Sequence, residues 1–121
     1  MQLSGFNINV TSEQPEVLAA WYRDVLELPP VPEMGEAAFS LGERTAFLID
    51  GHSETRGKAR EPQRVLINFM VDDLESERRR LLERGVQFIR PPEREPWGGL
   101  ITTFLDPDGN YLQLIEYKPG G

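Results

Sequence analysis

The 121-residue sequence contains no cysteine and a single histidine, His52. The lack of cysteine excludes a disulfide framework and a thiolate nucleophile, and one imidazole cannot build a metal centre alone. No apolar run reaches the roughly 18 residues that cross a bilayer. The first residues lack the basic and then apolar pattern of a secretion signal. We therefore expect no membrane partner and a cytoplasmic location.

Positive charge is also scarce, because 13 Lys and Arg residues face 20 Asp and Glu residues and the net charge is −7. A nucleic-acid-binding surface needs clustered basic side chains. The one basic run, Arg78-Arg79-Arg80, lies among glutamates and is typical of a solvated helix face with ion pairs. We therefore expect no nucleic-acid partner.

The segment from Phe104 to Tyr117 predicts a β-hairpin between strands at 100–105 and 111–117. Pro107 presets φ for a tight turn and Gly109 tolerates a positive φ, while the Asp106 carboxylate can accept backbone N–H groups. Alternation along the second strand directs Leu112 and Leu114 toward packed protein. It places Gln113, a neutral amide, on the opposite face.

A strand followed by a helix occurs twice in the sequence. When the chain is aligned with itself at an offset of 61 residues, Asn7 matches Asn68 and Val10 matches Val71, which indicates an internal repeat. The first copy predicts strands at 3–11, 37–41 and 45–49, with a helix capped by Thr11 or Ser12 that stops before Pro29. The second predicts strands at 65–71, 86–89, 100–105 and 111–117, with a break at Pro91-Pro92. Its helix is capped at Asp72 or Asp73 and closed by Gly85. A polar stretch, Asp50–Gln63, joins the copies.

Three motifs resemble the vicinal oxygen chelate superfamily of glyoxalases, bleomycin-resistance proteins and extradiol dioxygenases. They are the DPDGN turn at 106–110, the preceding Pro96-Trp97-Gly98, and the helix segment Ala20–Leu28, in which Glu27 replaces the family's glycine. The resemblance implies an α+β fold of two βαβββ modules in a single domain, 1–121. The modules span about 1–50 and about 64–121, with a linker at about 51–63. We expect these side chains to be among the most buried: Trp21, Tyr22, Leu26, Leu81 and Leu82.

Metal-dependent members of this superfamily hold a divalent ion with His and Glu side chains from four strands. Carried over position by position, these ligands fall on Gly5, on one residue of 46–48, on Leu66 and on Gln113. None of these is a good donor for such an ion. The resemblance therefore implies no metal, no cofactor and no catalytic residue. We expect His52 to be exposed in the polar linker.

In this fold the faces away from the helices line a cavity, and the repeated amides predict that it is neutral and hydrogen-bonding. The predicted ligand-binding residues are Asn7, Asn68, Gln113, Tyr111, Trp97, Phe47 and Met70. We therefore expect a metal-free, bleomycin-resistance-like homodimer that binds a small organic molecule, and we lean against an enzyme. Three alternatives stay open: a purely structural amide network, a metal-dependent lyase, isomerase or dioxygenase with displaced ligands, and a regulatory protein without a small ligand.

Overall fold

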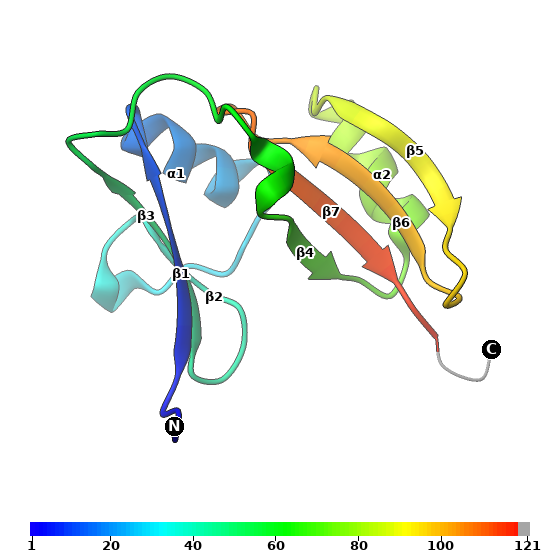
Figure 1. The fold of residues 1–121 in the computed structure, drawn as a ribbon, viewed down its shortest axis with the longest axis horizontal. Helices are drawn as coiled ribbons and strands as arrows, with labels where there is room; N and C mark the ends of the chain where they lie inside the picture. The colour runs from blue at the N-terminus through cyan, green and yellow to red at the C-terminus, as the bar shows by residue number, and fades with distance from the viewer. Residues whose placement is uncertain (119–121) are drawn as a thin grey trace. The chain divides into compact units, whose positions relative to one another are not determined.

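The computed structural model describes residues 1–118. The chain divides into two compact units, Met1–Gly57 and Lys58–Gly121, and each unit packs one helix against a small mixed sheet (Figure 1). This arrangement confirms the predicted α+β fold. Neither helix of the described part of the chain has the length and apolar character needed to cross a membrane.

The first unit contains a three-stranded sheet in the order β1-β3-β2. Its elements are β1 (Phe6–Ser12), α1 (Pro15–Asp24), β2 (Ala38–Ser40) and β3 (Thr45–Gly51). Strand β1 runs parallel to β3, β2 runs antiparallel to β3, and an isolated bridge joins Pro30 to Phe39 beyond β2.

The second unit repeats this topology with a full fourth strand, in the order β4-β7-β6-β5. Its elements are β4 (Ile67–Met70), α2 (Leu74–Glu83), β5 (Phe88–Arg94), β6 (Leu100–Leu105) and β7 (Tyr111–Glu116). Strand β4 is parallel to β7, and the other neighbours are antiparallel. The internal repeat predicted from the sequence is therefore a repeat of topology.

Helix α1 packs on its sheet through Leu18 and Tyr22, which are fully buried. The Tyr22 ring lies 4.8 Å from the Phe47 ring on β3. Of the predicted core residues, Tyr22 is confirmed, whereas Trp21 and Leu26 are only partly buried. Trp21 lies in the last turn of the helix, and Leu26 lies beyond its last residue, Asp24.

Two details of α1 differ from the prediction. The cap at Thr11 or Ser12 is wrong, because β1 extends through Ser12 and the helix begins only at Pro15. The Ser12 hydroxyl instead accepts a hydrogen bond from the Gln14 amide at 2.9 Å. Beyond the helix, Glu27 has a φ of 60°, a left-handed conformation that glycine adopts more easily. This left-handed backbone conformation explains why glycine is usual at this position in the superfamily.

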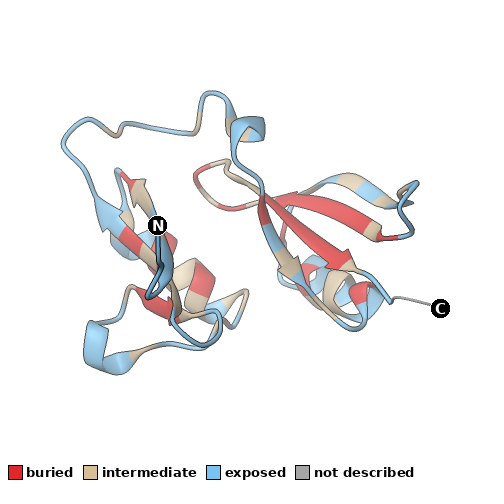
Figure 2. Cartoon of the chain, turned by 60° about the horizontal axis from the view of Figure 1, so that its bottom comes forward, coloured by how far each residue is buried: buried red, intermediate tan, exposed pale blue. Residues whose placement is uncertain are grey.

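Helix α2 packs on the second sheet through Leu74 and Leu81, which are at most 1% exposed. Most of β6 and β7 is buried as well and is red in Figure 2. The prediction for Leu81 is confirmed, and that for Leu82 is wrong, because Leu82 is 45% exposed. Leu81 follows Leu74 by seven positions, about two helical turns, so both side chains lie on one face of the helix. Leu82 is the next residue and points about 100° away from that face. Gly85 follows the helix with a φ of 81°, as the sequence predicts.

Replacing Asp73 by alanine should destabilise the start of α2 in a pH-dependent manner. Hydrogen bonds from the Ser76 hydroxyl at 2.8 Å and the Ser76 amide at 3.1 Å lower the pKa of Asp73 below its usual 3.8. A lowered pKa stabilises the fold above the unfolded-state pKa, and this contribution disappears as the pH falls through the folded-state pKa.

The matched variant is Asp73→Asn, which keeps a capping oxygen without the charge. In thermal unfolding, the difference in Tm between wild type and Asp73→Asn should be present at pH 7 and should shrink as the pH falls below 3.8, the usual pKa of this carboxyl group. A difference that stays the same size over this pH range would contradict the charged cap.

The predicted break at Pro91-Pro92 is wrong, because both prolines lie within strand β5. The strand continues through both prolines to Arg94, and its pairing with β6 shifts register between Phe88 and Arg90 and again between Arg90 and Glu93. Proline lacks a backbone N–H, so it is tolerated on an edge strand and at bulges. Strand β5 is the edge of its sheet, and each shift inserts an extra residue relative to β6.

The turn between β6 and β7 follows the prediction closely. One oxygen of the Asp106 carboxylate accepts the backbone N–H groups of Asp108 at 2.9 Å and Asn110 at 3.0 Å, and the other accepts the Asn110 side-chain amide at 2.8 Å. Gly109 has a φ of 80°. This turn fixes the register of β6 on β7, which places Thr103 opposite Gln113.

Candidate functional site

Polar side chains form a row across the second sheet, on the face turned away from α2. The α2 face is identified by the guanidinium of Arg78 in α2, which lies 5.4 Å from the Phe88 ring. Phe88 pairs with Phe104, and Phe104 with Leu112, so these residues share the α2 face. The opposite face carries one residue from each strand at the same level: Asn68, Gln113, Thr103 and Arg90.

Gln113 and Thr103 form a nearly buried hydrogen-bonded pair at the centre of this row. Gln113 is 8% exposed and Thr103 is 4% exposed. The Gln113 Nε2 atom donates to the Thr103 hydroxyl at 3.0 Å. A side-chain amide has two donor hydrogens and a carbonyl oxygen, so this bond leaves the Gln113 carbonyl oxygen as an acceptor.

Asn68 continues the row on β4, where it pairs with Gln113 in the register of the sheet. Its side chain is exposed and makes no hydrogen bond with the described part of the chain. The amide is therefore free to bind a ligand next to the Gln113 carbonyl. One edge of the row is thus open to solvent, while its centre is nearly closed.

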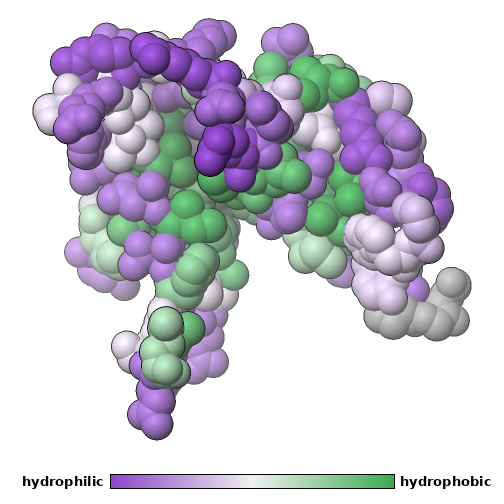
Figure 3. Space-filling model, viewed as in Figure 1, coloured by the Kyte–Doolittle hydropathy of each residue, from purple (hydrophilic) through white to green (hydrophobic). Residues whose placement is uncertain are grey.

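Apolar side chains flank the row on both sides. On one side lie Met70, Ile115 and Ile101, which share a level of the sheet, and on the other lie Tyr111 and Leu105. Ile101 and Ile115 are 8% and 7% exposed, whereas Met70 is 64% exposed. Figure 3 views this face and shows apolar atoms over β6 and β7 with hydrophilic atoms along β5. A few hydrogen-bonding groups within an apolar surround are typical of small-molecule sites.

The β5 end of the row carries charge. The Arg90 guanidinium donates from Nε to Glu93 at 3.2 Å and from its terminal nitrogen to Glu95 at 2.5 Å. The bond with Glu95, followed by that with Glu93, raises the pKa of Arg90 above its usual value. Arg90 is thus held between two carboxylates, and the three groups together carry one negative charge.

The first unit places two of its predicted residues on different faces of its sheet. Asn7 pairs with Ala46, and it is exposed on the face away from α1. Phe47 is fully buried on the α1 face against Tyr22. Phe47 is therefore part of the core between α1 and its sheet, and it does not lie on the surface that carries Asn7.

Trp97 lies in the hairpin between β5 and β6 and is 52% exposed. Its ring lies 5.5 Å from the Tyr117 ring in an edge-to-face arrangement. The ring also covers Gly99, where an added Cβ would lie only 2.0 Å from it. A glycine at 99 is therefore required for this placement of Trp97 at the margin of the sheet.

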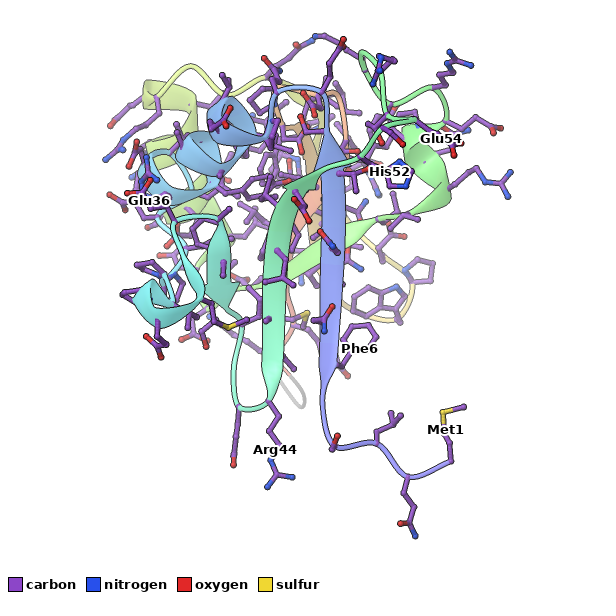
Figure 4. All side chains as sticks on the ribbon, turned by 90° about the vertical axis from the view of Figure 1, so that its left-hand side faces the viewer. Met1, Phe6, Glu36, Arg44, His52 and Glu54 are labelled. Atoms are coloured by element: carbon purple, nitrogen blue, oxygen red, sulfur yellow. The ribbon has the colours of Figure 1, made fainter. Side chains whose placement is uncertain are left out.

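The predicted exposure of His52 is confirmed. It follows β3 in a loop, and its Nδ1 accepts the backbone N–H of Glu54 at 3.1 Å (Figure 4). Within residues 1–118, no three His, Asp or Glu side chains are grouped so that they could hold a metal ion. At the positions where relatives bind a metal, Leu66 and Gly5 offer no donor, and Gln113 offers only a neutral amide, so these residues do not fit a divalent ion.

Thr103 was missed by the sequence reasoning, although its signal is present. The predicted turn at 106–110 pairs 105 with 111 and therefore 103 with 113, which places the Thr103 hydroxyl beside Gln113. Arg90 could not be found in this way. The two register shifts of β5 decide which of its residues point to this face, and they are not visible in the alternation of the sequence.

Comparison with known proteins gives consistent results. The sequence profile of the glyoxalase/bleomycin resistance protein/dioxygenase superfamily matches residues 7–114. The uncharacterized protein YraH of Bacillus subtilis (strain 168) is 27% identical over 108 residues, covering 79% of this chain and 84% of YraH.

Two solved structures share the fold over nearly their whole length. A member of the same superfamily from Sphaerobacter thermophilus DSM 20745 is 25% identical with a TM-score of 0.72, and the match covers 97% of this chain and 99% of that one. A protein of unknown function from Agrobacterium tumefaciens str. C58 is 21% identical with a TM-score of 0.74, covering 98% and 97%.

Proposed function

Because the chain belongs to the glyoxalase/bleomycin resistance protein/dioxygenase superfamily, we propose that it binds a small organic molecule on the polar row of its second sheet. The observation that carries the proposal is the nearly buried Gln113–Thr103 pair, which leaves an amide carbonyl beside the free amide of Asn68. The ligand donates a hydrogen bond to the Gln113 carbonyl and packs its apolar part on Ile101 and Ile115.

Binding without catalysis is the activity that these side chains support. The row supplies amides and a hydroxyl from Asn68, Gln113 and Thr103, which are neutral at any ordinary pH and poor proton-transfer groups. Neither histidine nor cysteine is present in the second unit, since His52 lies in the first and the chain has no cysteine. The second unit therefore offers no imidazole or thiol for base or nucleophilic chemistry, and the two glutamates at the end of the row, Glu93 and Glu95, are held by Arg90.

The alternative of a purely structural amide pair makes a different prediction. A structural pair needs only its own hydrogen bond, and it would give the exposed Asn68 no role. A binding row uses Asn68, because that side chain is exposed and makes no other hydrogen bond. Asn68 therefore separates the two possibilities.

Replacing Asn68 by leucine should weaken ligand binding by about tenfold or more while leaving the fold intact. The side chain is exposed, so its replacement removes no internal hydrogen bond. Small uncharged amides and alcohols would be screened by thermal shift, in which a bound ligand raises Tm by mass action, and each hit would be retested on Asn68→Leu.

The matched control is Gln87→Leu, which replaces another exposed amide just before β5. It should bind each hit as tightly as wild type does. Hits that bind Asn68→Leu and Gln87→Leu equally well would refute this location of the site, even if the protein binds small molecules elsewhere.

A further inference from the structure

The polar row ends in a charged group, in which Glu93 and Glu95 both contact Arg90. We propose that Glu93 and Glu95, by holding the Arg90 guanidinium, make this face reject carboxylate ligands in favour of uncharged molecules and amines. The inference deepens the proposed function and rests on it, since it concerns the ligand class of the same face. Arg90 is the specificity-determining residue, and the two glutamates position it.

Geometry places Arg90 within reach of a ligand on the row. Arg90 pairs with Thr103, so its side chain leaves the sheet on the same face as the Gln113–Thr103 pair. Neighbouring strands lie about 5 Å apart, so about 10 Å separates the level of Gln113 on β7 from that of Arg90 on β5. A molecule the size of one aromatic ring with a short polar arm spans much of that distance.

An unengaged arginine here would attract anions, because a guanidinium binds carboxylates through two parallel hydrogen bonds. In this structure two glutamates already occupy the guanidinium, from Nε and from a terminal nitrogen. Other N–H groups of the guanidinium remain, but a carboxylate ligand that approached them would face the net negative charge of the Arg90–Glu93–Glu95 group. An amide or an ammonium group meets no such repulsion.

The two bulges of β5 bring these groups together. Between Arg90 and Glu93 the strand advances three residues while β6 advances two, from Thr103 to Ile101. The extra residue places Arg90 and Glu93 on the same face, which simple alternation would not do. The Arg90 carbonyl is fixed from the other face, because it accepts the Thr102 hydroxyl at 2.7 Å.

The test uses three probes that share a skeleton and differ in charge: phenylacetamide, phenylacetate and 2-phenylethylamine. Dissociation constants would be measured by ligand-observed NMR up to about 10 mM, the range expected for fragments of this size. Wild type should bind phenylacetamide at least about tenfold more tightly than phenylacetate. The variant Glu93→Gln/Glu95→Gln, which releases Arg90, should bind phenylacetate about tenfold more tightly relative to phenylacetamide than wild type does.

Two further variants separate local from general effects. Glu75→Gln/Glu77→Gln removes two carboxylates that pair with Arg78 and Arg80 on α2, across the sheet from the row, and it should not alter the preference. Adding Arg90→Gln to Glu93→Gln/Glu95→Gln should abolish the gain for phenylacetate. Circular dichroism of each variant shows whether it is folded.

The outcomes distinguish the two proposals. The proposed selectivity would be overturned if wild type bound phenylacetate and phenylacetamide equally well. It would also be overturned if releasing Arg90 gave no gain in phenylacetate binding. Neither result would contradict the proposed binding face. Failure of all three probes to bind both wild type and the Glu93→Gln/Glu95→Gln variant would overturn the binding face and the selectivity together.

Discussion

Replacing Phe104 by alanine should lower the free energy of unfolding by about 3–5 kcal/mol, the usual cost of removing a fully buried phenylalanine ring. Phe104 is 0% exposed on the α2 face of β6, and its ring lies 5.2 Å from the Phe88 ring. The change removes this aromatic contact and leaves a cavity, because the surrounding side chains relax only in part to fill the space.

Urea unfolding followed by circular dichroism would measure the loss, and Phe104→Leu would be the graded control with a smaller effect. Each unit contains one tryptophan, Trp21 in the first and Trp97 in the second, so fluorescence can report on both. A loss below about 1 kcal/mol for Phe104→Ala would show that the core of the second unit is not packed as described.

Replacing Asp106 by alanine should cost about 2–4 kcal/mol, although Asp106 lies in a turn and not in a strand. Asp106 is 4% exposed, and its carboxylate accepts hydrogen bonds from Asp108 and Asn110. Hydrogen bonds to a charged acceptor contribute more than neutral ones, and removing the acceptor leaves part-buried backbone N–H groups unsatisfied.

The control is Asp72→Ala, which removes an exposed carboxylate just before α2 and should change stability little. Hydrogen exchange would locate the effect, because amides of β6 and β7 next to the turn should exchange faster in Asp106→Ala. Equal stability of Asp106→Ala and Asp72→Ala would mean that the turn forms without its carboxylate.

The sequence predicts most of the second unit because local signals there agree with tertiary packing. Asp73 caps α2, Gly85 closes it, and the turn that Asp106 organises sets the register of β6 on β7. The errors occur where tertiary context decides. Strand β5 continues through Pro91-Pro92 because it lies at a sheet edge, and Leu82 is exposed because α2 presents a narrow face.

The candidate site is predictable only in part. Asn68 and Gln113 follow from alternation and from the repeat, and their pairing across β4 and β7 agrees with it. Phe47 was misassigned because alternation alone does not say which face of its strand meets the helix. Arg90 required the bulges of β5, which only the structure reveals. The homodimer and the cytoplasmic location remain predictions from the sequence.

The central claim is that the face of the second sheet turned away from α2 binds a small uncharged molecule. The most direct measurement is a titration of ¹⁵N-labelled protein with phenylacetamide, followed in ¹H–¹⁵N correlation spectra. We expect the side-chain amide resonances of Asn68 and Gln113 and the backbone amide resonance of Thr103 to shift together, with one dissociation constant. The backbone amide resonances of Trp21 and His52 in the first unit should stay unchanged. Saturable shifts confined to other residues, or none up to about 10 mM, would contradict it.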